Sequence, residues 1–260
     1  MKTALLCVSF GTSVPAARKN ITAVEDALRQ EIPQADFFRA FTSKTIRGIL
    51  AKKGELLWSA DEALEHLTDG RYDQVVVQPT HFLYGLEYES LKASVEEARK
   101  RFPALLLGKP LLSGTQDLQT LAKILMKEYP QKEGSALVFM GHGTPHFSNV
   151  VYPAMQTVFH MMGRKDVYVG TVMGWPGIGG ICDQLRMGEY SHVRTAPLML
   201  VAGDHALNDM AGEDENSWKS VLTREGYEVE CIMQGLGVLP GVQEMYRKCL
   251  RGLLNQREGN

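Results

Sequence analysis

The chain has 260 residues, enough for one large domain or two of ordinary size, and its 44% hydrophobic and 22% charged residues are usual for a globular enzyme. A net charge of −2 without a basic stripe argues against a nucleic-acid or membrane-surface binder. No apolar stretch approaches the ~20 residues of a membrane-spanning helix, and the short apolar run at the N-terminus lacks a signal-peptide cleavage site. We therefore expect a cytoplasmic protein.

Short apolar runs alternate with amphipathic segments, which is typical of parallel sheets covered by helices on both faces. Strands are predicted at residues 3–9, 35–41, 73–78, 104–107, 135–140, 167–172, 193–200 and 228–232. Helices are predicted around residues 21–28, 58–69, 88–102, 115–128, 150–162, 213–225 and 241–254. A polar stretch with Pro130 and Gly134 leaves four strands on either side, which predicts two α/β domains at residues 1–130 and 131–260.

The two predicted halves contain matching strand ends. The loop after the first strand resembles the loop after the fifth, which pairs Phe10 with His142 at an offset of 132 residues. A second match pairs Glu87 with His205 at an offset of 118 residues. We expect two related halves facing each other across a cleft, where the carboxyl ends of the strands bring His142, His205 and Glu87 to one place.

These side-chain types fit metal or proton chemistry. Histidine commonly binds divalent transition metals and accepts a proton near neutral pH. Glycines on both sides of His142 would let a bulky ligand approach its ring. The alternatives are a turn residue for His142, a loop residue for His205 and a first-turn helix carboxylate for Glu87. His81 and Glu89 are weaker candidates.

Nucleotide binding is not indicated. The loop after the first strand lacks the Gly-Lys-Ser/Thr of a Walker loop, and no Gly-x-Gly-x-x-Gly follows that strand. The glycine-rich stretch from Gly174 to Gly180 contains Pro176, and we interpret it as a flexible loop.

Five segments together resemble a known family, the anaerobic sirohydrochlorin cobaltochelatases, which are ATP-independent class II tetrapyrrole chelatases. The segments are Leu6–Ser13, Phe38–Ser43, Gly85–Glu89, Val138–Gly143 and Pro197–Met210. The resemblance runs nearly end to end, and the last two segments, which hold His142 and His205, are the most specific. Leu86 stands where an acidic residue is common in the family.

The resemblance implies two similar α/β domains, each a four-stranded parallel sheet flanked by helices. It implies insertion of Co²⁺ into sirohydrochlorin in anaerobic cobalamin biosynthesis, without a nucleotide and with release of two pyrrole protons. It also implies that His142, His205 and Glu87 bind the metal and act in catalysis, because they match the active-site residues of the family.

Side chains at strand ends are candidates for binding sirohydrochlorin, an apolar ring edged with carboxylates. The candidates for the ring faces are Phe10, Phe82, Tyr84, Met140 and Trp175, and those for the carboxylates are the hydroxyls of Ser9, Thr12, Ser13, Thr42 and Ser43. Arg39 or Lys44 could meet further carboxylates.

Other interpretations stay open. The same ligands accept Fe²⁺ or Ni²⁺, so a sirohydrochlorin ferrochelatase or another tetrapyrrole chelatase is an alternative. A non-catalytic carrier of a metal or tetrapyrrole would also suit two lobes, although most such proteins have an export signal. We expect no nucleic-acid or membrane partner, and the sequence leaves open whether the chain forms a homo-oligomer.

Overall fold

The computed structural model describes residues 2–255, and its contacts divide the chain into two compact units. The first unit comprises Met1–Ser113 and Gly237–Asn260, and the second unit comprises Gly114–Leu236. Each unit is built on a four-stranded parallel sheet, with strand orders β2-β1-β3-β4 and β6-β5-β7-β8. The shared strand order confirms the predicted fold of two similar α/β halves.

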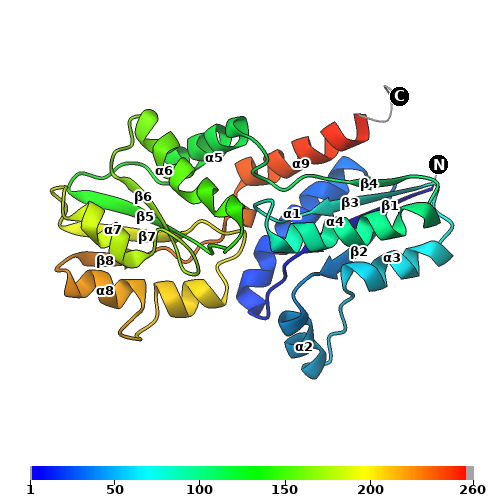
Figure 1. The fold of residues 1–260 in the computed structure, drawn as a ribbon, viewed down its shortest axis with the longest axis horizontal. Helices are drawn as coiled ribbons and strands as arrows, with labels where there is room; N and C mark the ends of the chain where they lie inside the picture. The colour runs from blue at the N-terminus through cyan, green and yellow to red at the C-terminus, as the bar shows by residue number, and fades with distance from the viewer. Residues whose placement is uncertain (1, 256–260) are drawn as a thin grey trace. The chain divides into compact units, whose positions relative to one another are not determined.

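The first unit alternates strands and helices. Its strands are β1 (Thr3–Ser9), β2 (Asp36–Phe41), β3 (Gln74–Pro79) and β4 (Leu105–Leu107), and its helices are α1 (Pro15–Glu31), α2 (Lys44–Lys52), α3 (Ala60–Asp69), α4 (Leu86–Ala98) and α9 (Pro240–Asn255). β1 is buried along its whole length, as expected of a central parallel strand covered on both faces. Its residues Ala4, Leu6 and Val8 share a core with α3 and α4, and Figure 1 shows these two helices lying along the sheet. The other two long helices of the unit, α1 and α9, pack against each other.

The second unit repeats this plan. Its strands are β5 (Ser135–Gly141), β6 (Val167–Thr171), β7 (His192–Pro197) and β8 (Glu228–Cys231), and its helices are α5 (Thr115–Glu128), α6 (Val151–Met161), α7 (Ile178–Leu185) and α8 (Trp218–Arg224). Ala136, Val138 and Met140 of β5 share a core with α7 and α8. Figure 1 shows α5 and α6 on the opposite face of this sheet. The carboxyl ends of β5, β6 and β7 therefore lie along one edge.

The structure differs from the sequence prediction in several elements. The strand predicted at 193–200 ends at Pro197, because proline has no N–H with which to continue the ladder. α2 was not predicted; it is only nine residues long, and of its apolar residues Ile46, Ile49 and Leu50 only Leu50 is buried. The glycine-rich stretch predicted as a flexible loop runs into α7, which begins at Ile178 and buries Ile181 and Leu185.

The two units also differ from the predicted division between residues 130 and 131. α5 precedes that point but packs against α6, so it lies in the second unit. α9 comes last in the chain but packs against α1, so it lies in the first unit. A helix is grouped with the sheet that buries its apolar face, whatever its place in the chain order.

Candidate functional site

His142 lies on a tight loop at the carboxyl end of β5. The strand ends at Gly141, and Gly143 has a φ of +81°, a left-handed conformation that residues with side chains rarely adopt. A Cβ atom at Gly143 would lie 2.5 Å from the backbone nitrogen of Gly174, so this loop packs directly on the loop after β6. The imidazole of His142 is nevertheless exposed to solvent.

His205 follows β7, the strand that pairs with β5 in the second sheet. It lies directly before a short π-helix, Ala206–Met210. Its Nδ1 atom is 2.7 Å from Oδ2 of Asp209, which is one turn further along the helix. The two side chains are 35% and 44% exposed, so solvent reaches both members of the pair.

The structure brings His142 and His205 together, as predicted. Their ring centroids are 4.8 Å apart and the ring planes are inclined by 80°. Nδ1 of His142 lies 2.7 Å from the carbonyl oxygen of Gly143, which can only accept, so Nδ1 carries the proton. The carboxylate of Asp209 fixes the proton of His205 in the same way. With Nδ1 protonated, Nε2 is the ring atom whose lone pair can bind a metal ion or a proton.

Glu87 occupies the corresponding position in the first unit. β3 ends at Pro79 and β7 ends at Pro197, and Glu87 and His205 each come eight residues after the proline. Glu87 is exposed in the first turn of α4, whose N-cap is Gly85. A carboxylate at this place can bind a cation and also stabilises the helix dipole.

The hydroxyl residues predicted to bind substrate carboxylates fall into two groups. Ser9, Thr12 and Ser43 are buried, and their side chains hydrogen-bond within the loops of the first unit. Ser13 and Thr42 are only half-buried. The buried group shapes the loops after β1 and β2, and Ser13 and Thr42 are the members accessible to a ligand.

The side chains predicted to face the macrocycle also differ in exposure. Phe10 is 43% exposed and Trp175 is 71% exposed, while Tyr84 is half-buried with its ring 5.1 Å from that of Tyr88. Met140 is fully buried in the core of the second sheet. Side chains alternate along β5, which directs Met140 toward α7 and α8 and away from any ligand.

Arg39 is also placed differently from the expectation that it meets a substrate carboxylate. Its guanidinium forms a two-pronged ion pair with Glu25, in which Nε lies 2.7 Å from Oε1. The Glu25 side chain is 1% exposed, so this charge depends on Arg39 for compensation. Arg39 therefore stabilises the packing of α1 on β2.

His81, a weaker candidate in the sequence, lies in a buried polar region of the first unit. Burial lowers the pKa of His81 from 6.5 to about 4, so its ring is neutral near pH 7. Its Nε2 atom lies 3.5 Å from Oγ1 of Thr42, and its buried Nδ1 atom has no hydrogen-bond partner among the described residues. Its burial sets it apart from the exposed Glu87.

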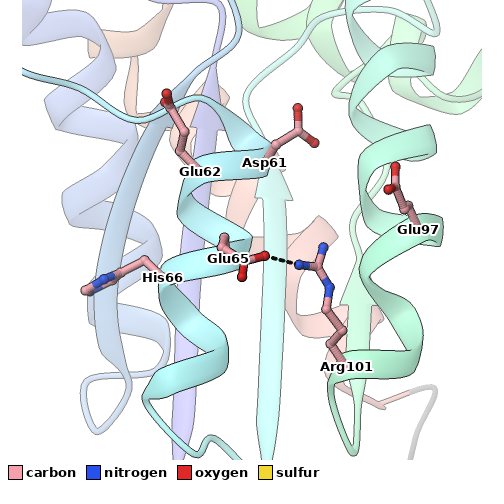
Figure 2. Close-up of a pocket in the computed structure, with 6 residues that line it drawn as sticks. All are labelled: Asp61, Glu62, Glu65, His66, Glu97 and Arg101. Carbon is pink, nitrogen blue, oxygen red and sulfur yellow. Dashed lines mark hydrogen bonds and ion pairs between the residues drawn. The ribbon is translucent and has the colours of Figure 1, made fainter.

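A surface pocket of about 600 Å³ lies elsewhere in the first unit and holds none of the predicted site residues. Figure 2 shows its lining between α3 and α4, where Glu65 forms an ion pair with Arg101. The other lining residues are Asp61, Glu62, His66 and Glu97. Within residues 2–255 no group of three or more His, Cys, Asp or Glu side chains is arranged to hold a metal ion. The paired imidazoles of His142 and His205 are thus the strongest candidate site that the geometry offers.

Comparison with known proteins identifies the family. The family model for cobalt chelatase (CbiK) matches residues 3–255. The chain belongs to the cobalt chelatase (CbiK) family. It is 38% identical to the sirohydrochlorin cobaltochelatase of Salmonella typhimurium, over 98% of this chain and 97% of the relative. It is 32% identical to the sirohydrochlorin cobaltochelatase CbiKC of Nitratidesulfovibrio vulgaris, over 94% of this chain and 88% of the relative. The predicted resemblance is confirmed.

Solved structures support the same chelatase fold. SirB from Bacillus subtilis with Fe³⁺ has a TM-score of 0.69 at 15% identity, covering 100% of this chain and 98% of that one. CbiX, the terminal enzyme for biosynthesis of siroheme in denitrifying bacteria, has a TM-score of 0.55 at 16% identity, covering 96% and 98% of the two chains. At these identities the likeness concerns the fold alone.

Asp209 is a residue of this cobalt chelatase (CbiK) family member to which the sequence analysis assigned no role. Asp209 orients His205 and fixes its proton on Nδ1. The signal was available, because residues four apart on a helix face each other and Asp209 follows His205 by four. The sequence did not predict a helical turn at this place, so the spacing was not used.

Proposed function

We propose that this chain inserts Co²⁺ into sirohydrochlorin without a nucleotide, in anaerobic cobalamin biosynthesis. Membership of the cobalt chelatase (CbiK) family and the two cobaltochelatase relatives support this activity. The observation that carries the site assignment is the pair His142 and His205, with ring centroids 4.8 Å apart and both lone pairs on Nε2.

Two imidazoles suit a metal that must be captured and then released. Neutral nitrogen ligands bind Co²⁺ readily, and two of them leave several coordination positions for water and for the incoming pyrrole nitrogens. As each pyrrole nitrogen bonds to the metal, an imidazole can leave it. His142 and His205 would thus transfer the ion without a permanent metal site.

The reaction also releases two protons. Each pyrrole N–H that exchanges its hydrogen for the metal needs a base nearby, and an imidazole that has just released the metal has a lone pair to accept it. Because Nδ1 of each ring is already protonated, the new proton goes to Nε2. We assign to Glu87, which matches the family motif, the roles of a further metal ligand and proton acceptor.

Substrate contacts belong to the same proposal. Phe10, Trp175 and Tyr84 offer aromatic surface for the macrocycle, and Ser13 and Thr42 offer hydroxyls to its carboxylates. Ser9, Thr12 and Ser43 would act indirectly, because their buried side chains shape the loops that carry these groups.

An anaerobic spectroscopic assay with sirohydrochlorin tests the activity. Purified protein is mixed with excess sirohydrochlorin and Co²⁺, and in parallel with Fe²⁺ or Ni²⁺, without nucleotide. A cobaltochelatase converts many equivalents of sirohydrochlorin per protein, with Co²⁺ preferred. A carrier would stop at one equivalent, and a preference for Fe²⁺ would favour the ferrochelatase alternative.

Histidine variants test the site. His142→Ala and His205→Ala should each lower the insertion rate by about 100-fold or more, the usual scale for losing a catalytic base or ligand. His142 lies in a loop and His205 at the start of a short helix, and solvent reaches both side chains, so the thermal unfolding midpoint should change little. His192→Ala, an exposed histidine of the second unit paired with Glu228, is the matched control. Equal activity in all three variants would refute the site assignment.

Location and assembly complete the proposal. Across residues 2–255 no helix has both the length and the apolar character needed to cross a bilayer. We place the protein in the cytoplasm, which cell fractionation would test. Analytical ultracentrifugation would establish whether the chain forms a homo-oligomer.

A further inference from the structure

The loop that carries His142 needs an external support. A three-residue turn with glycine on both sides of the histidine has more backbone freedom than a turn flanked by residues with side chains. Its carbonyl groups are held by the loop after β6: the carbonyl of Gly141 accepts from Val172 at 3.0 Å, and that of His142 accepts from Met173 at 2.8 Å. These bonds fix one side of the turn and leave its N–H groups to be satisfied elsewhere.

Tyr152 supplies that second support. It lies in the first turn of α6 and is 5% exposed. Its hydroxyl oxygen accepts the backbone N–H of Gly143 at 3.2 Å. Burial raises the pKa of this hydroxyl, and the hydrogen bond from the backbone N–H of Gly143 opposes the rise.

The ring of Tyr152 also explains why residue 141 is a glycine. A Cβ atom at Gly141 would lie 2.1 Å from Cε1 of Tyr152, which is well inside van der Waals contact. The ring therefore lies directly against the backbone of Gly141 and leaves no room for a side chain. From these contacts we propose that Tyr152 is a positioning residue that holds His142 in place for metal capture, an inference that rests on the function proposed above.

The repeat within the chain provides an internal comparison. At the offset of 132 residues, Gly141 corresponds to Ser9 and Tyr152 corresponds to Asn20. The first unit has a side chain at the position of Gly141, and it has no tyrosine at the position that would collide with it. At this position of the repeat, only the half that presents a histidine at the strand end pairs a glycine with a buried tyrosine.

The test compares two tyrosine variants of the same unit. Tyr152→Phe removes the hydroxyl that accepts the N–H of Gly143 but keeps the ring. Tyr168→Phe is the matched control, because Tyr168 is 8% exposed and its hydroxyl donates to Tyr190 at 3.3 Å, apart from the histidine loop. Both variants lose one buried hydroxyl, so their unfolding midpoints should fall by similar amounts.

Binding of Co²⁺ alone to the protein is the first readout. Tyr152→Phe should weaken Co²⁺ binding by about 10-fold, the lower end of the effect expected when the support of a metal-binding histidine is removed. It should also alter the visible absorption spectrum of the bound Co²⁺ and raise the KM for Co²⁺, with the KM for sirohydrochlorin unchanged. Tyr168→Phe should change none of these.

A second variant acts on the same contact from the other side. Gly141→Ala keeps the hydroxyl but displaces the ring, so it should weaken Co²⁺ binding as Tyr152→Phe does. Equal Co²⁺ affinities for Tyr152→Phe, Tyr168→Phe and the unaltered protein would overturn the positioning role while leaving the proposed function intact. Unchanged Co²⁺ binding in His142→Ala would instead contradict the metal site itself.

Discussion

The hydrogen bond between His205 and Asp209 allows a quantitative prediction about metal capture. Asp209→Ala removes the carboxylate that lies 2.7 Å from Nδ1 of His205. The ring then loses its preferred orientation, and the Nδ1-protonated form loses its advantage over the other tautomer. Both changes lower the fraction of protein in which Nε2 presents its lone pair to a metal ion.

The size of the effect follows from the exposure of the pair. Loss of a partner that orients a metal-binding histidine costs about 10- to 100-fold in metal affinity. His205 and Asp209 are 35% and 44% exposed, so solvent weakens their interaction. We therefore expect the lower end, about 10-fold or about 1.4 kcal/mol of binding free energy. The free energy of unfolding should fall by less than about 1 kcal/mol, as for other solvent-exposed pairs.

Isothermal titration with Co²⁺ and the rate of insertion at limiting Co²⁺ provide the assay. Asp204→Ala is the matched control, since it removes the same charge from the same segment and breaks a 2.9 Å hydrogen bond to Asn208 without touching His205. An equal loss of Co²⁺ affinity in the two variants would show that only the overall charge matters, and would refute the orienting role of Asp209.

Three further variants have distinct expected outcomes. Glu87→Gln should slow metal insertion about 10- to 100-fold, with sirohydrochlorin binding, measured by fluorescence quenching, nearly unchanged. An unchanged insertion rate would show that Glu87 only stabilises the start of α4. Burial lowers the pKa of His81 from 6.5 to about 4, so its ring binds a proton more tightly in the unfolded chain than in the folded protein. The folded protein therefore loses stability as the pH falls from 6.5 to 4. Urea titrations should show a loss of about 3 kcal/mol between pH 6.5 and 4 that disappears in His81→Gln but persists in His192→Gln. Arg39→Ala leaves the charge of buried Glu25 without a partner and should lower the free energy of unfolding by about 3 kcal/mol or more, without weakening sirohydrochlorin binding. Weaker sirohydrochlorin binding at unchanged stability would instead show that Arg39 contacts the substrate.

The strands and the histidine pair could be predicted from the sequence for a common physical reason. A central parallel strand is buried on both faces and reads as an unbroken apolar run, as β1 and β5 do. Parallel strands also end at the same edge, so residues that follow β5 and β7 come together without any need to know the packing. The proximity of His142 and His205 could therefore be predicted from the strand topology alone.

The contacts made by individual side chains could not be predicted in this way. Tyr152 follows Gly141 by eleven residues and lies on a different element, so only the packing of α6 shows that its ring fills the space beside the glycine. Met140 and Arg39 have side chains of a type that could contact a ligand. Met140 is instead packed in the core, and Arg39 is paired with the buried Glu25. Side-chain type indicates what a residue can do, and burial decides whether a ligand can reach it.

The return of α9 to the first unit bears on the order in which the protein can be made. The first unit is interrupted in sequence by the whole of Gly114–Leu236, and its last helix is synthesised after that segment. α9 buries Tyr246, whose hydroxyl donates to the backbone carbonyl of Thr80 at 2.7 Å. During translation all residues of the second unit are therefore available before α9 is made. Until then, the first unit lacks the helix that packs against α1. The half of the chain that leaves the ribosome first is therefore the last to be completed.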